Sequence, residues 1–85
     1  MINKSASRVG TLVFKSGIRN TLYVGTNSNT GETILWQQCG DRRAKRSTGR
    51  NLRRVVKELS YVLASGEARW DGEVNGASLA ALQQA

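Results

Sequence analysis

Residues 48–63 read TGRNLRRVVKELSYVL, and this stretch decides the fold. At about 100° per residue, the apolar side chains gather in one stripe along a helix. That stripe consists of Leu52, Val55, Val56, Leu59, Val62 and Leu63. Ser47 or Thr48 is suited to capping the N-terminus, and Gly66 stands where a helix-ending glycine belongs. The spacing therefore predicts an amphipathic helix over residues 48–65 that needs an apolar partner.

That partner lies earlier in the chain, in three segments with strand character. Residues 9–15 and 20–26 are rich in β-branched and aromatic side chains, and residues 32–38 form a third such segment. A turn-forming cluster at residues 27–31 separates the second from the third. Connections this short favour an antiparallel meander. The inward side chains are expected to be Leu12, Phe14, Leu22, Val24 and either Ile34 with Trp36 or Leu35.

The C-terminal residues give a weaker signal. Residues 69–74 are compatible with a short strand or with a tight turn at Asp71-Gly72. Asn75 is placed to cap a last short helix that carries Leu79 and Leu82. Together the elements predict one α+β domain over residues 1–85. Its three-stranded antiparallel meander is covered by one amphipathic helix (β-β-β-α) and followed by a short strand or turn and a short C-terminal helix.

The composition excludes several classes of protein. No apolar run approaches ~18 residues, so no membrane span is expected. The first residues lack the apolar core of a secretory leader, and a single cysteine suits a reducing compartment, so we expect the cytoplasm. One cysteine and no histidine cannot make a Cys/His zinc site. The remaining expectation is a small basic domain without a metal.

The formal net charge of +7 is concentrated in one part of the chain. Residues 42–57 hold eight basic side chains and no acid, whereas residues 58–85 hold one arginine against four acids. Such a block repels itself unless an anion neutralises it. Its members, with the tyrosine expected on the same helix face, are the candidate site residues: Arg42, Arg43, Lys45, Arg46, Arg50, Arg53, Arg54, Lys57 and Tyr61.

Nothing in the residues favours catalysis. The six acids are scattered, and no phosphate-binding or dinucleotide-binding glycine pattern is present. Cys39 has no histidine to activate it, so we interpret it as a small packing residue. We therefore expect a protein that is not an enzyme and that uses no cofactor.

The basic block favours nucleic acid, with DNA preferred over RNA. Arginine binds phosphates and guanine edges in a forked geometry, and the helix N-terminus adds its own positive dipole. We expect Arg42, Arg43, Lys45 and Arg46 to lie in a loop that leads into the helix, so that loop, helix end and helix face converge. The sheet surface away from the helix is a second candidate. Its possible members are Thr11, Val13, Lys15, Thr21, Tyr23, Thr33, Leu35 and Gln37.

The order of elements also resembles known DNA-binding modules. Between Val9 and Leu63 the chain has a strand ending in Lys15-Ser16-Gly17, a second containing Leu22-Tyr23-Val24, a Thr30-Gly31 turn, a third strand, a basic segment and an amphipathic helix. This layout resembles the arm-binding domains of phage and transposon integrases and the plant AP2-type domains. The resemblance implies DNA binding through the sheet, whereas this chain concentrates its charge on the helix and its approach.

Two other interpretations stay open. The basic face also suits docking to an acidic protein partner, as an inhibitor of a host enzyme or of a nucleic-acid-binding complex would. An assembly protein that packs against a genome inside a capsid would share the same block. A thin core without a disulfide also favours a homodimer, formed through the exposed sheet face or through residues 77–84.

Overall fold

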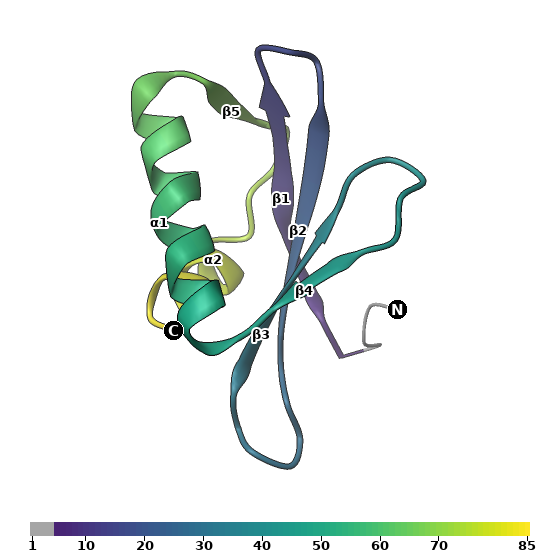
Figure 1. The fold of residues 1–85 in the computed structure, drawn as a ribbon, viewed down its shortest axis with the longest axis vertical. Helices are drawn as coiled ribbons and strands as arrows, with labels where there is room; N and C mark the ends of the chain where they lie inside the picture. The colour runs from purple at the N-terminus through teal and green to yellow at the C-terminus, as the bar shows by residue number, and fades with distance from the viewer. Residues whose placement is uncertain (1–4) are drawn as a thin grey trace.

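The computed structural model describes residues 5–85 and contains five strands and two helices (Figure 1). Their bounds are β1 (Ser7–Phe14), β2 (Arg19–Thr26), β3 (Thr33–Gln38), β4 (Lys45–Ser47), α1 (Gly49–Ser65), β5 (Ala68–Asp71) and α2 (Gly76–Gln83). The five strands form one antiparallel sheet in the order β4-β3-β2-β1-β5. The predicted α+β fold, with its meander, long helix and short C-terminal helix, is confirmed.

The sheet is wider than the three strands that the sequence predicts. Residues 45–47 were expected in a loop, but they form β4, with Ser47 opposite Leu35 and Lys45 opposite Gln37. This edge strand is short and polar, so it lacks the apolar alternation by which strands are recognised. Residues 68–71 form β5 on the other edge, beside β1, which settles the open choice between strand and turn.

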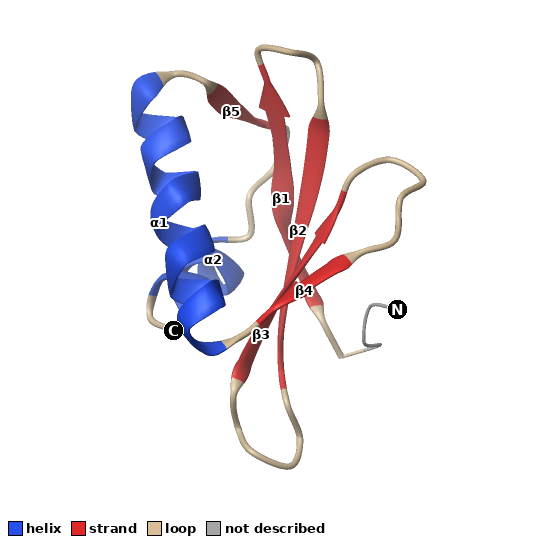
Figure 2. Ribbon diagram, in the orientation of Figure 1, coloured by secondary structure: helices blue, strands red, loops and turns tan. Residues whose placement is uncertain are grey.

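Helix α1 connects the two edges of the sheet and covers one of its faces. It begins after Thr48, whose backbone is extended, and ends at Gly66, which has a φ of 80° and donates its N–H to the Leu63 carbonyl. Leu52 and Val55 are buried, and the rest of the predicted apolar stripe packs around them. Figure 2 shows α1 along one side of the strands. Helix α2 lies on the same side, where Leu79 and Leu82 line a cavity with Leu59 of α1.

The pairing register decides which strand residues meet α1. Leu22 and Val24 on β2 face the helix, and Val24 lies opposite Leu35 of β3. Leu35 is fully buried in the cluster that contains Leu52, so Leu35 faces inward and its neighbours Ile34 and Trp36 face away. Successive side chains alternate between faces, so Thr33 and Gln37 join Leu35 on the covered face. Three of the eight possible members of the opposite surface therefore lie on the covered face, and the open choice for β3 is settled with Leu35 inward.

Each tryptophan of the chain lies against a glycine, one on each face of the sheet. A Cβ added to Gly10 would lie 2.9 Å from the ring of Trp70, which packs against the core on the covered face. A Cβ added to Gly25 would lie 2.9 Å from the ring of Trp36 on the opposite face. Trp36 is only 4% exposed, although neither α1 nor α2 covers that face. Both glycines therefore leave room for an indole ring.

Helix α2 is part of the core of the same chain. The side chain of Asn75 accepts a hydrogen bond from the backbone N–H of Ser78 at 3.0 Å, which confirms the predicted cap. Leu82 is 2% exposed and Leu79 is partly buried against the same cluster. These two leucines are consequently packed within their own chain.

Candidate nucleic-acid interface

The outer face of α1 carries a row of exposed cations. Arg50, Arg53, Arg54 and Lys57 are all exposed, and Tyr61 beside them is 72% exposed. They lie outside because the apolar stripe of the same helix is held against the sheet. We call these five residues the helix face.

The charges of the helix face have no carboxylate partner. Within residues 5–85 the structure contains one ion pair, between Arg19 and Asp71, which belongs to the sheet. Arg54 donates to the side-chain oxygen of Asn51 at 3.3 Å, which leaves its charge in place. Glu58 lies at the border of the face and shares a shallow hollow with Arg54 and Tyr61. The helix face is therefore a cationic surface whose charges form no ion pair, with Glu58 as the acid at its border.

The remaining basic residues of the 42–57 block lie elsewhere, so the predicted convergence on one surface is wrong. Arg42 and Arg43 belong to the loop between β3 and β4, which Figure 1 shows on the side of the sheet away from α1. The Gln38 side chain donates to the carbonyls of Gly40 and Arg42, which holds this loop closed. Strand β4 lies between this loop and α1 in the chain, so Arg42 and Arg43 are separated from the cations of the helix face.

Strand β4 divides its own two cations between opposite faces. Lys45 lies opposite Gln37 on the covered side and lines a cavity of about 200 Å³ with Val55 and Glu58. Arg46 lies opposite Trp36 and therefore points away from α1.

The N-terminus of α1 is close to a carboxylate of the same chain. A Cβ built on Gly49, which has a φ of 56°, would lie 3.7 Å from Oε1 of Glu32. The first turn of α1 contains no acid, so Glu32 is the anion that approaches the positive end of the helix dipole. This position therefore adds less to anion binding than the sequence suggested.

The sheet surface away from α1 carries four arginines from four strands, which we call the sheet face: Arg8, Arg19, Arg46 and Arg69. All four are exposed. Reasoning from the sequence missed them because they are far apart along the chain and only the register brings them to one face. The sequence signal that could have placed them is the alternation of side chains between the two faces of a strand, because each arginine directly precedes or follows a buried residue in its strand.

Three hydrogen bonds orient guanidinium groups of this sheet face, and one of them runs from Nη1 of Arg8 to the Glu73 carbonyl at 3.5 Å. Arg8 donates through Nη2 to the Thr11 hydroxyl at 2.9 Å, and Thr11 shares a hydrogen bond with Thr21 at 2.9 Å. Arg19 is hydrogen-bonded to Asp71 and forms the ion pair with it. That hydrogen bond and the charge of Arg19 lower the pKa of Asp71 below its ordinary value. Arg8, Arg46 and Arg69 have no carboxylate partner among residues 5–85.

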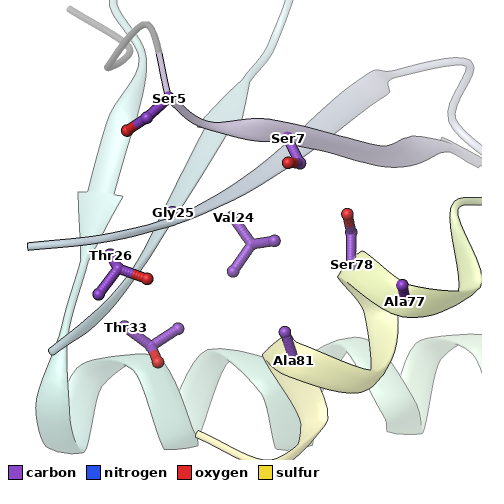
Figure 3. Close-up of a pocket in the computed structure, with 9 residues that line it drawn as sticks. All are labelled: Ser5, Ser7, Val24, Gly25, Thr26, Thr33, Ala77, Ser78 and Ala81. Atoms are coloured by element: carbon purple, nitrogen blue, oxygen red, sulfur yellow. The ribbon is translucent and has the colours of Figure 1, made fainter. Parts of the chain in front are cut away.

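Among the described residues 5–85, no charged side chain lines the cavity between the sheet and helix α2. It has a volume of about 370 Å³, and Figure 3 shows small side chains around it, with Thr26 and Thr33 on one side and Ala77, Ser78 and Ala81 on the other. It therefore provides hydroxyl and methyl groups and no acid, base or metal ligand.

Other features of residues 5–85 give no sign of a reactive centre. No group of three or more metal-ligating side chains comes together there. Cys39 is a free, half-buried thiol. None of the helices in this part of the chain has the length and apolar character needed to cross a membrane.

Comparison with protein-family models, with curated proteins and with solved structures finds no match to this chain. The function is therefore argued from the surfaces of the fold.

Proposed function

We propose that the protein is a DNA-binding accessory protein that contacts the phosphate backbone through the helix face of α1. One observation carries the proposal: Arg50, Arg53, Arg54 and Lys57 are exposed along one side of a helix, and no carboxylate is paired with them. A row of unpaired cations on a rigid element is costly to the isolated fold and favourable beside a polyanion.

The dimensions of the row suit a nucleic-acid backbone. From residue 50 to residue 57 the helix rises about 10 Å at 1.5 Å per residue. Duplex DNA carries one negative charge per about 1.7 Å of axis, so several phosphates lie within reach of such a row. Guanidinium groups bind phosphate oxygens in a forked geometry, and the phenol of Tyr61 adds a hydrogen-bond donor at the end of the row.

A salt titration of binding tests the proposal. Fluorescently labelled duplex DNA, single-stranded DNA and RNA of equal length are titrated with wild-type protein at several salt concentrations. The variant Arg50→Ala/Arg54→Ala removes two charges from the helix face. The variant Ser28→Glu/Gln84→Glu lowers the net charge equally at two exposed positions outside it. Circular dichroism confirms that each variant is folded.

Wild type is expected to bind duplex DNA most tightly, with a steep dependence on salt. Each lost phosphate contact reduces the slope of log K against log salt by about 0.9 for duplex DNA, so the alanine variant loses about 1.8. The charge-matched control retains the wild-type slope. No binding to any of the three nucleic acids at ~50 mM salt would overturn the proposal, and so would equal losses in the two variants.

The same preparation distinguishes a protein partner from nucleic acid. Material that co-purifies with the protein and disappears after nuclease treatment supports the proposal. A protein partner that is retained after nuclease treatment, and lost from the Arg50→Ala/Arg54→Ala variant, would instead assign the helix face to an acidic protein.

A homodimer is part of the proposal, and its surface follows by elimination. Leu79 and Leu82 are packed within their own chain, and the sheet face carries like charges that would repel their symmetric copies. We therefore propose that dimerisation joins the exposed edge of β4 or of β5 to its copy. Analytical ultracentrifugation at tens of micromolar tests this, and a monomer at that concentration overturns it.

A cytoplasmic location likewise stays a prediction, which fractionation of expressing cells tests.

A further inference from the structure

We infer that the protein has two DNA-binding surfaces that point in opposite directions, the helix face and the sheet face, and that one chain bridges two duplexes. The inference rests on the proposed function and extends it from one bound duplex to two.

The sheet face has the charge and the extent of a second binding surface. Arg46 lies on the edge strand β4 and Arg69 on the opposite edge strand β5, so the arginines span five strands. At about 4.8 Å between strands, this is about 19 Å. Asp71 is the acid among them, and it neutralises Arg19. The other three arginines form no ion pair within residues 5–85, although the charge of Arg69 also acts on Asp71.

The side chains between these arginines favour a duplex over a single strand. Binding of single strands relies on exposed aromatic rings on which bases stack. Trp36 is 4% exposed, so its ring is not available for stacking. Tyr23, on the same face, is half-buried. The exposed side chains of this face are those of its four arginines, whose guanidinium groups bind phosphates.

A single short duplex cannot contact both surfaces. The sheet, the apolar core and α1 lie between them, in a molecule whose Cα atoms extend 38 × 26 × 22 Å. The Debye length is about 8 Å at physiological ionic strength, so each surface attracts its own anion. Duplex DNA is stiff over about 150 base pairs and would not fold around so small a body. Occupation of both surfaces therefore requires two segments.

A bridging assay tests the inference. A duplex of about 20 base pairs, far below the persistence length, is immobilised on beads, and recovery of a second, fluorescent duplex is measured with and without protein. The variants are Arg46→Ala/Arg69→Ala on the sheet face and Arg50→Ala/Arg54→Ala on the helix face. Ser28→Glu/Gln84→Glu serves again as the control with the same net charge. Binding of each variant to one labelled duplex is measured in parallel.

We expect wild type and the control to recover the second duplex. Each alanine variant is expected to reduce that recovery about tenfold and to bind a single duplex more weakly than wild type, through the one surface that it retains. If the wild-type protein binds no duplex at all, the proposed function itself is overturned. Single-duplex binding without recovery of a second duplex would overturn only the bridging inference.

One outcome separates bridging by one chain from bridging by a dimer. If Arg46→Ala/Arg69→Ala recovers the second duplex as well as wild type does, two joined copies each hold a duplex on their helix faces. That result would overturn the inference and leave the proposed function intact.

Discussion

The two faces of the sheet are made from alternate residues of the same strands, and they have opposite properties. On the covered face, Leu12, Leu22 and Leu35 are almost fully buried under α1 and α2. On the open face, the positions between them hold arginines, threonines and Tyr23, together with the buried Ile34 and Trp36. The difference teaches that a small domain can build its main core on one side of a sheet and present exposed charges on the other.

The largest effect is expected on the free energy of unfolding when a core side chain is truncated. Two neighbouring residues of β1 allow the two faces of the sheet to be compared in this way. Leu12 is fully buried on the covered face, and Val13 is half-buried on the open face. Leu12→Ala leaves a cavity and is expected to lower the free energy of unfolding by about 2–5 kcal/mol. Val13→Ala loses little burial and is expected to cost less than about 1 kcal/mol. Urea unfolding measures both, and equal costs would contradict the division of the sheet into a covered and an open face.

An intermediate effect is expected where a tryptophan lies against a glycine. Gly25→Ala places a methyl group against the buried ring of Trp36, and Gly10→Ala does so against Trp70. Each is expected to lower the free energy of unfolding by about 1–3 kcal/mol, because the added atom displaces a packed ring. Urea unfolding followed by tryptophan fluorescence measures the cost. A neutral Gly25→Ala would show that the Trp36 ring is free to move and that the open face has no packed ring.

The smallest expected effect on stability concerns the ion pair of the open face. Because Arg19 holds the pKa of Asp71 below its ordinary value of 3.8, the pair stabilises the fold above that pH and is lost as the pH falls through the lowered pKa. Asp71→Asn is therefore expected to reduce stability slightly at pH 7 and not at all in strong acid. Both side chains are well exposed, so solvent screens the pair.

The same variant is expected to act more strongly on binding than on stability. Asp71→Asn frees the charge of Arg19 and should tighten duplex binding at the sheet face. Glu67→Gln raises the net charge equally at an exposed position in the turn before β5 and serves as the control. Equal tightening in the two variants would show that only the total charge matters and would remove the distinction between the sheet face and the rest of the surface.

The apolar pattern of the sequence predicted the fold well. The positions of the charged side chains on the surface were predicted less well. The stripe from Leu52 to Leu63 predicted α1 because a helix held against a sheet needs a continuous apolar side. Strand β3 was ambiguous, since Ile34, Leu35 and Trp36 are all apolar and all buried, on opposite faces. The pattern of alternation cannot orient a strand that is apolar on both sides.

The order of residues in the sequence does not by itself predict where the charged side chains lie on the surface. The block at residues 42–57 is continuous in the sequence, but the polar strand β4 directs Arg46 away from the helix face. Arg8 and Arg69 are far apart in the sequence and lie on adjacent strands β1 and β5. Both results depend on pairing between strands, which is set by the whole sheet and not by local composition.

The position of β5 has a consequence for biosynthesis. Strand β1 is made first and pairs with β2 through a short turn, but its other edge pairs with β5, from Thr11 opposite Asp71 to Phe14 opposite Ala68. On the ribosome, this edge stays unpaired until α1 and residues 68–71 have been synthesised. An unpaired edge is a template for other strands, so the nascent chain is open to intermolecular pairing during that interval.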